Sequence, residues 1–401
     1  MRYITILIIP LFSLFAKEAT VEEIISEVKR SHPLVEIMKT KRELAKTKTQ
    51  LSVANEELSA EISAIRAKED EGKSTKEFAF SLSKEFLTPS AKGVLKNSGK
   101  KMRQAKELLL KKEFYDLIYT IKERFYDTCL NKEKYLLKKE NLKNLISFTD
   151  KMKKAYKLGE ISKKDLLSLN MEVKKEKKEL SLSKNEIKNS LMSLKEAISS
   201  SNIEFDDISC EQNLKIKDPN LNTDDFIKES PSIKARKLKI EALRELLKKY
   251  SLFSDKYSLG VEYSDETGVK KYIASIGFPL YFSSEKRELQ KKEILQTLSL
   301  EISRLKNETA RMKASLLRLK TRLKSIYENY ETINEIGQET LRLNKMVEKS
   351  YLNGESSIVE LLNAKRELIE TKLKSIEYKK EYFKTLFNLY KTASVEEKEI
   401  K

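Results

Sequence analysis

The pattern of hydrophobic and polar positions follows the same order of elements in each half of the chain. Each half contains a helix that opens at a proline (Pro33 and Pro231), two short alternating strands, a very long helix, a glycine-containing tip and a return helix. The tip glycines, Gly159 and Gly354, lie roughly 195 residues apart, which indicates an internal duplication. The sequence therefore predicts a mainly α-helical protein with a small β part, built from two long helical hairpins.

The strands are recognised by a change of period from helical to two. Apolar and aromatic residues alternate there with Ser, Gly, Glu and Ala, and nine of them are expected to share one outward, lipid-facing side: Phe78, Phe80, Leu82, Tyr257, Leu259, Val261, Tyr263, Tyr272 and Ile276. The strands are expected to pair as two hairpins that turn at residues 70–73 and 265–268. Such alternation is typical of membrane barrel strands, and it equally fits an antiparallel sheet with one wet face.

After each hairpin comes a helix that would rise roughly 100 Å at 1.5 Å per residue. Propensity alone does not stabilise such a length, so a continuous packing seam is required. In the second half the seam alternates spacings of four and three, which is a heptad pattern typical of coiled coils; it comprises Leu298, Ile302, Leu305, Thr309, Met312, Leu316, Leu319, Leu323, Ile326, Tyr330 and Ile333. The return helix repeats every seven residues at Leu362, Ile369, Ile376, Phe383 and Tyr390.

The start of the chain resembles a secretory signal: Arg2 precedes an apolar run that ends near Ala16. A stretch rich in Asn, Asp, Pro and Ser separates the two halves and is expected to connect them. The predicted organisation is a signal peptide at 1–16, a first repeat at 17–198 (hairpin 58–86, long helix 90–158, return helix 163–198), a connector at 199–229, a second repeat at 230–393 (hairpin 256–282, long helix 284–353, return helix 357–393) and a tail at 394–401.

Charged residues make up 35% of the chain, and the net charge is +18. Lysines alternate with glutamates along the whole length instead of forming a compact basic block, so we expect solvated helix faces and no nucleic-acid partner. His32 is the single histidine, and the sequence has no phosphate-binding loop or nucleophile motif, so neither an enzyme nor a cofactor is expected. A disulfide between Cys129 and Cys210 is one interpretation in an oxidising compartment, but the favoured one places Cys129 as a small apolar residue of a helix.

Four strands leave two unpaired edges, which lipid does not tolerate. If the strands cross a membrane, copies of the chain must close the sheet. Two copies would give eight strands filled by side chains, and three would give twelve strands around a passage.

The duplicated layout resembles the TolC-type outer-membrane efflux and secretion channels. The resemblance rests on the helix starts at 32–34 and 230–231, on Gly277-Phe278-Pro279-Leu280 after the last strand, and on the two tips at 156–167 and 351–364. It implies a homotrimer with a twelve-stranded β-barrel in the outer membrane and a helical tunnel in the periplasm. It also implies docking to a periplasmic adaptor (a membrane fusion protein) bound to an inner-membrane transporter, with no chemistry in the channel itself.

The resemblance also assigns roles to the tips. The adaptor-docking residues would be Leu158, Gly159, Glu160, Asn353, Gly354 and Glu355, although the glycines equally fit simple turn geometry. The pore entrance would be lined by Asp165, Glu360 and Asn363. Some relatives hold the closed gate with an arginine that bonds the position of Asp165; here Ser356 stands at the arginine position, so that contact is expected to be missing or rebuilt with Lys163 or Lys164.

A second interpretation is a secreted coiled-coil rod or scaffold, which would explain the heptads and the signal. It does not explain strands at corresponding positions of two repeats. The exported substrate is not predicted by the sequence.

Overall fold

The computed structural model describes residues 18–68, 74–198, 203, 205–210, 214–266, 268–281 and 284–396. The predicted signal peptide, the first hairpin turn at 70–73 and most of the tail lie outside these residues. The elements in chain order are β1 (Glu18–Ala19), α1 (Val21–Ser31), α2 (Pro33–Leu51), β2 (Leu58–Lys68), β3 (Ser74–Leu87), α3 (Pro89–Lys157), α4 (Lys163–Ala197), β4 (Asp207–Ile208), α5 (Thr223–Glu229), α6 (Pro231–Leu247), the 3₁₀ helix η1 (Lys248–Ser251), β5 (Lys256–Glu266), β6 (Val269–Gly277), α7 (Glu285–Leu352) and α8 (Ile358–Ala393).

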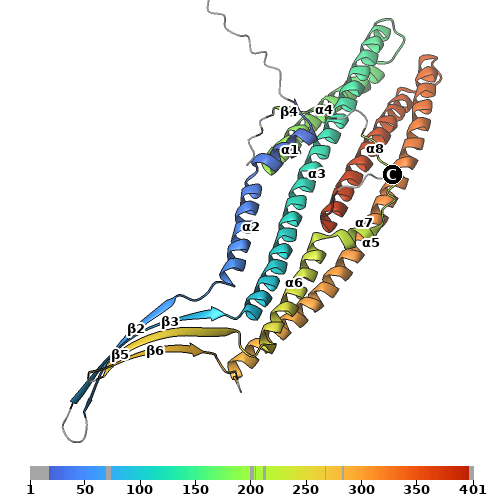
Figure 1. Cartoon of the computed structure of the whole chain (residues 1–401). Helices are drawn as coiled ribbons and strands as arrows, with labels where there is room; N and C mark the ends of the chain where they lie inside the picture. The colour runs from blue at the N-terminus through green and yellow to red at the C-terminus, as the bar shows by residue number, and fades with distance from the viewer. Residues whose placement is uncertain are drawn as a thin grey trace, which may run out of the picture.

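The molecule is elongated, with the four long strands projecting from one end of a helical body (Figure 1). Next to the sheet, the helices lie side by side in the order α2, α3, α6 and α7. At the far end, α3 with α4 and α7 with α8 form two separate hairpin tips. The predicted fold class is therefore confirmed for one chain: mainly helical, with two long hairpins and a four-stranded antiparallel sheet.

The long helices α3 and α7 begin at side-chain caps and continue because each buries a stripe of side chains. Thr88 accepts a hydrogen bond from the backbone of Ala91 and is followed by Pro89, while Ser284 caps α7. The central part of the predicted seam of α7 is buried, comprising Met312, Leu316, Leu319, Leu323 and Ile326.

One residue of that seam departs from the expectation, because Ile302 is 44% exposed. At this level Glu301 is the residue of α7 that faces α6, where it pairs with Arg236 and Lys239. Its neighbour Ile302 therefore lies away from the α6 contact.

The sheet has the strand order β2-β3-β5-β6, and every pair is antiparallel. The register places Phe80 beside Tyr263, and Tyr263 beside Tyr272. The two repeats thus meet in the middle of the sheet, through β3 and β5. In the described chain, β2 and β6 each pair on one side only.

The largest core lies midway along the helices, where short elements missed by the sequence analysis surround α3 and α8. The strands β1 and β4 pair in parallel, and α1 begins with a capping box formed by Thr20 and Glu23. In this region Tyr390 stacks on Tyr119 and meets Phe226 of α5 edge-on. The predicted connector is therefore partly structured and packs onto the helical body.

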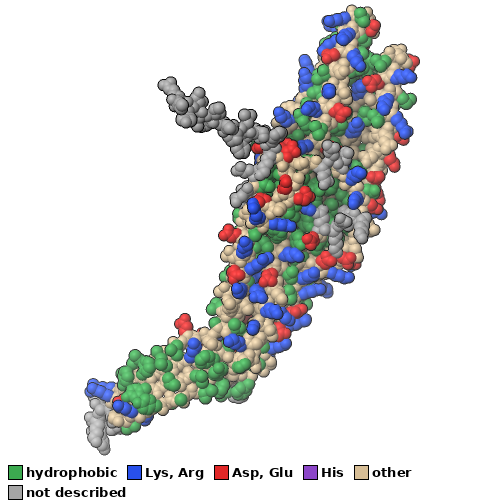
Figure 2. Space-filling view, turned by 45° about the horizontal axis from the view of Figure 1, so that its top comes forward, with side chains coloured by type: hydrophobic (Ala, Val, Ile, Leu, Met, Phe, Trp, Pro, Cys, Tyr) green, Lys and Arg blue, Asp and Glu red, His purple; other side chains and the backbone are tan. Residues whose placement is uncertain are grey.

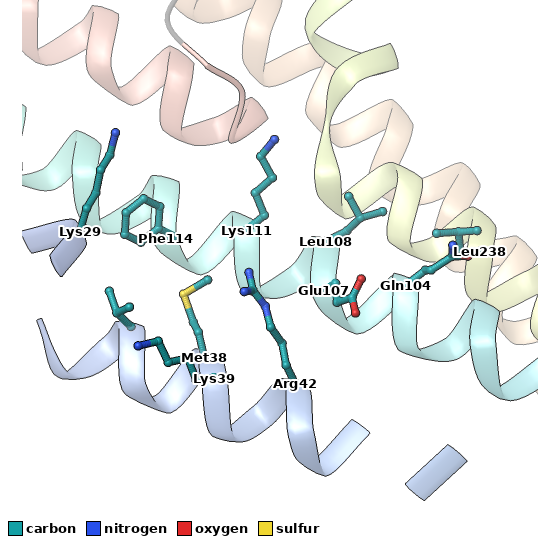
Figure 3. Close-up of a pocket in the computed structure, with 11 residues that line it drawn as sticks. Lys29, Met38, Lys39, Arg42, Gln104, Glu107, Leu108, Lys111, Phe114 and Leu238 are labelled. Carbon is teal, nitrogen blue, oxygen red and sulfur yellow. The ribbon is translucent and has the colours of Figure 1, made fainter. Parts of the chain in front are cut away.

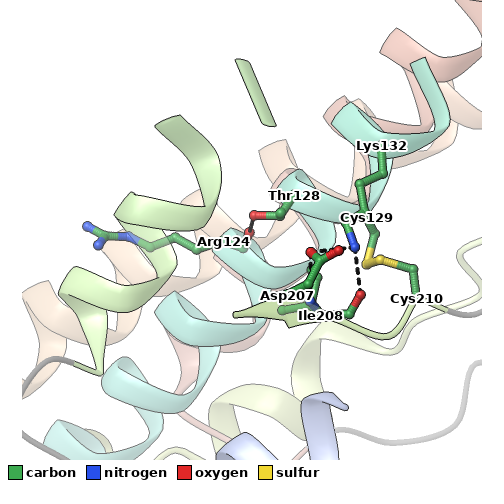
Figure 4. The surroundings of a disulfide bond; sticks show 7 residues. All are labelled: Arg124, Thr128, Cys129, Lys132, Asp207, Ile208 and Cys210. Atoms are coloured by element: carbon green, nitrogen blue, oxygen red, sulfur yellow. Dashed lines mark hydrogen bonds and ion pairs between the residues drawn. A yellow bond between two sulfur atoms is a disulfide. The ribbon is translucent and has the colours of Figure 1, made fainter. Parts of the chain in front are cut away.

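A disulfide ties the connector to the first long helix. Cys129 is buried on α3, as expected, but it is bonded to Cys210, so the expectation of a simple apolar residue is wrong. Lys132, one turn further on, donates to the carbonyl of Ile208 at 2.7 Å and pairs with Asp207 at 2.6 Å (Figure 4). The covalent bond and the two polar contacts fix β4 against α3.

Candidate functional site

All nine residues predicted to face lipid lie on one side of the sheet. The register aligns Leu82 with Val261, and Leu259 with Ile276, and the side-chain period of two places the remaining members on the same face. Several of them are exposed in the single chain, among them Tyr272 (79%), Ile276 (62%) and Val261 (57%). Figure 2 shows hydrophobic side chains gathered over the sheet, whereas charged side chains are spread over the helices.

The opposite face of the sheet carries mostly small and charged residues, together with the exposed side chains of Ile65 and Ile273. Ser81 lies beside Glu262, and Ser83 lies beside Gly260. A Cβ atom at Gly260 would lie 2.7 Å from the hydroxyl of Ser275, and one at Gly277 would lie 2.6 Å from that of Ser258. The two glycines therefore leave room for the serine side chains on this polar face.

None of the described helices contains a stretch that is both apolar and long enough to cross a membrane.

The two tips have the same backbone geometry. Gly159 and Gly354 adopt φ values of +80° and +78°, a conformation that favours glycine. In the first tip the amide of Glu160 donates to the carbonyl of Ala155 at 3.0 Å, and in the second the amide of Glu355 donates to that of Ser350 at 2.9 Å. With the accompanying bonds from the glycine amides, these are Schellman motifs that end α3 and α7.

The six predicted docking residues are all exposed around these turns: Leu158, Gly159, Glu160, Asn353, Gly354 and Glu355. Leu158 is 75% exposed, and Leu352, next to the second turn, is 64% exposed. Each tip thus presents an apolar side chain beside an acidic one on a rigid reverse turn.

Asp165 and Glu360 occupy the same position in the two repeats, three residues after a serine that caps the return helix. The amides of Asp165 and Glu360 donate to the hydroxyls of Ser162 and Ser357 at 3.0 and 3.2 Å. Glu360 also accepts a 2.9 Å bond from the amide of Ser357, which completes a capping box. Both carboxylates therefore stabilise the positive end of a helix in addition to any role at the entrance.

Glu360 and Asn363 lie one turn apart on α8, and Asp165 lies in the first turn of α4. Burial raises the pKa of Tyr351 at the end of α7, and the charge of Asp165 raises it further, so the start of α4 lies close to the end of α7. Asn363 accepts a 3.4 Å hydrogen bond from Arg366. Within the described residues, the carboxylate of Asp165 forms no ion pair with Lys163 or Lys164.

An ion pair between Arg366 and Glu172 joins the two hairpins instead. The guanidinium of Arg366 on α8 donates to both carboxylate oxygens of Glu172 on α4, at 3.2 and 3.1 Å. The Glu172 side chain is only 11% exposed, and its hydrogen bond raises the pKa of Arg366. The sequence analysis missed this pair because the partners are 194 residues apart.

A small apolar cluster lies beside the ion pair and holds the hairpins together just below their tips. Its buried members come from α3, α4 and α8, and they are Leu145, Phe148, Met152, Leu169, Ile358, Leu361 and Leu362. The hydroxyl of Tyr351 contacts the sulfur of Met152 at 3.8 Å across the two repeats. The tips are therefore free at their ends and joined at their base.

The chain has the fold of outer-membrane channels. It superposes on CusC with a TM-score of 0.74 at 14% identity, and the match covers 95% of each chain. It also matches the CmeC outer membrane channel of Campylobacter jejuni (TM-score 0.70, 14% identity, 93% of this chain and 85% of that one). The open state of the MtrE outer membrane channel of Neisseria gonorrhoeae gives a TM-score of 0.69 at 12% identity, covering 93% of this chain and 88% of that one.

No family model matches the sequence, and no curated protein matches it either. The predicted resemblance to TolC-type channels is nevertheless confirmed at the level of the fold, over nearly the whole chain.

Proposed function

We propose that this chain is one subunit of an outer-membrane channel that serves as the passive exit duct of a tripartite efflux or type I secretion system. The observation that carries the proposal is the four-stranded sheet, whose one face is exposed and apolar while the other carries mostly small and charged residues. Exposed apolar patches of this kind need a cover. In a closed barrel the apolar face would meet lipid and the polar face would line a wet passage.

Unpartnered edges of the single chain support a homotrimer. Among the described residues, the outer strands β2 and β6 each pair along one edge only, and three copies would close them into twelve strands. The outermost helices also carry exposed apolar stripes at intervals of seven residues: Ile37, Leu44 and Leu51 on α2, and Leu295 and Ile302 on α7. Stripes at this interval are suited to helix packing between neighbouring copies.

The helical body would then extend into the periplasm as a tunnel, with its tips turned away from the outer membrane. The exposed tips fit docking to a periplasmic adaptor that is itself bound to an inner-membrane transporter. Asp165, Glu360 and Asn363 would line the entrance, and the Arg366–Glu172 pair would help to hold it closed.

Two matched lysine substitutions test which face of the sheet meets lipid. Val261→Lys places a charge on the apolar face and should abolish insertion, because a lysine on the lipid face costs about 2–4 kcal/mol at the bilayer midplane. Ser81→Lys places the same charge on the polar face of the neighbouring strand and should leave a heat-resistant trimer in the outer-membrane fraction with altered ion conductance in planar lipid. Equal assembly of the two variants would contradict the proposed orientation.

The same fractionation separates the channel from the alternative of a secreted rod. A rod would be recovered as a soluble extended oligomer that conducts no ions. The exposed aromatic face of the sheet favours the channel, since a soluble rod would leave that face in water.

A further inference from the structure

An open groove lies on the helical body, away from the sheet and the tips. It lies between α2 and α3, is bordered by α1 and α6, and has a volume of about 750 Å³, which is in the range of small-molecule sites. Its apolar lining comes from three helices: Val35 and Met38, Leu108 and Phe114, and Leu238.

The polar lining of the groove is strongly basic. Lys29, Lys39, Arg42 and Lys111 come from α1, α2 and α3. In Figure 3 the side chains of Lys39 and Arg42 lie beside Met38, whereas those of Lys29 and Lys111 flank Phe114 and point away from α2. Glu107 is the single acidic residue of the lining, and Arg103 already pairs with it at 3.7 Å.

The four cations also lack counter-ions. Within the described part of the chain none of them forms an ion pair, although neighbouring basic residues do: Lys41 pairs with Glu113 at 2.9 Å and Lys101 with Glu241 at 3.0 Å. The four side chains are exposed, so solvent screens part of the repulsion between them, and an anion placed among them would relieve the remainder.

The geometry points to a binding site for a single-chain amphipathic anion, such as an aliphatic carboxylate. Its tail would cover the apolar floor, and its head group would meet Arg42, whose guanidinium offers paired donors to a carboxylate. Lys111 would turn toward the head group from the Tyr115 ring, over which its ammonium lies at 5.4 Å. A neighbouring copy of the chain is a poorer occupant, because the apolar stripe of α2 suited to a partner helix (Ile37, Leu44 and Leu51) does not line the groove. This inference goes beyond the proposed channel function and does not depend on it.

The absence of tryptophan from the chain allows a direct test. Phe114→Trp would place the only tryptophan of the protein in the groove, and Leu108→Trp serves if the first variant does not fold. The full-length protein in nanodiscs is titrated with 12-bromododecanoate, whose bromine quenches nearby indole fluorescence. We expect saturable quenching that a control tryptophan outside the groove, Tyr378→Trp, does not show.

Charge variants and matched ligands complete the experiment. Arg42→Gln with Lys111→Gln should raise the apparent Kd at least ten-fold, whereas Lys139→Gln with Lys143→Gln, two exposed lysines of α3 outside the groove, should leave it unchanged. Equal quenching by brominated dodecanol, or equal quenching of the control tryptophan, would overturn the assignment of an anion site. Comparable quenching in nanodiscs that contain brominated phosphatidylglycerol, without added carboxylate, would show that the groove takes a two-chain membrane lipid and would overturn the proposal of a single-chain ligand.

Discussion

The ion pair between Arg366 and Glu172 offers the sharpest test of how the entrance is held. The pair joins α8 to α4, which belong to different hairpins, so it must break if the two tips separate. Arg366→Ala removes two hydrogen bonds to Glu172 and one to Asn363, and it leaves Glu172 mostly buried, with Lys175 at 3.7 Å as its remaining cation.

The size of the effect follows from the exposure of the two partners. Removal of one partner from a buried ion pair costs about 3–5 kcal/mol of stability, whereas an exposed pair contributes only about 0–1 kcal/mol. Here the Glu172 side chain is 11% exposed and that of Arg366 is 43% exposed, so solvent screens one partner. We therefore expect a coupling of about 1.5 kcal/mol per chain, which is roughly ten-fold in the ratio of closed to open entrance. If three chains open together, the factors multiply to about a thousand-fold.

Single-channel recording in planar lipid measures this ratio directly. Arg366→Ala and Glu172→Gln should both raise the open probability, and the exchanged pair Glu172→Arg with Arg366→Glu should restore much of the closed state. Arg322 provides a matched control, since it pairs with Glu381 at 2.7 Å but joins α7 to α8 within one hairpin. If Arg322→Ala opens the channel as much as Arg366→Ala does, or if the exchanged pair restores nothing, the reasoning fails.

Four further predictions concern other parts of the molecule. Glu360→Gln should lower the cation selectivity of the channel. The capping box is kept, because glutamine can replace glutamate there, so the change would report the charge alone. An unchanged reversal potential would remove Glu360 from the entrance. Gly354 has a positive φ, so Gly354→Ala should destabilise its tip by about 1–2 kcal/mol and weaken efflux without loss of the trimer. Gly93 lies in helical geometry with equally open space around it, so Gly93→Ala should be tolerated. Normal drug resistance in Gly354→Ala would argue against docking at this tip. Glu301 is buried, which by itself raises its pKa, but Lys239 and Arg236 outweigh burial and hold the pKa below its ordinary value. Its stabilising contribution is therefore complete above the ordinary pKa and is lost as the pH falls through the lower folded value, so Glu301→Gln should remove this acid sensitivity in thermal melts. At neutral pH the substitution should cost about 1–2 kcal/mol, because the cations left behind are partly exposed and Arg236 still pairs with Glu308 at 2.6 Å. Finally, a maleimide should label neither cysteine of the denatured protein before reduction and both after it, and labelling without reductant would exclude the disulfide.

Local periodicity was sufficient to predict the face of the sheet and most of the seam of α7. Alternation along Tyr257 to Tyr263 defines a face because a strand reverses its side chains at every residue. The seam from Met312 to Ile326 is buried because the heptad period follows the helix. The turns at Gly159 and Gly354 were predicted from the residue type alone, and both have positive φ.

Features that join distant segments could not be predicted in this way. The disulfide of Cys129 with Cys210 and the pair of Arg366 with Glu172 depend on how the hairpins pack, and no local pattern encodes that. The strands β1 and β4 are two residues long, too short for any period to show. The exposure of Ile302 likewise depends on which neighbour α7 meets at that level.

The disulfide makes the two halves of this duplicated chain unequal. It closes a covalent ring whose ends are 81 residues apart, and the whole first tip, from α3 through α4, lies inside that ring. The second tip has no such tether. A protease that cuts at Gly159 would therefore leave one molecule until a reductant is added, whereas a cut at Gly354 would release two fragments at once on a denaturing gel.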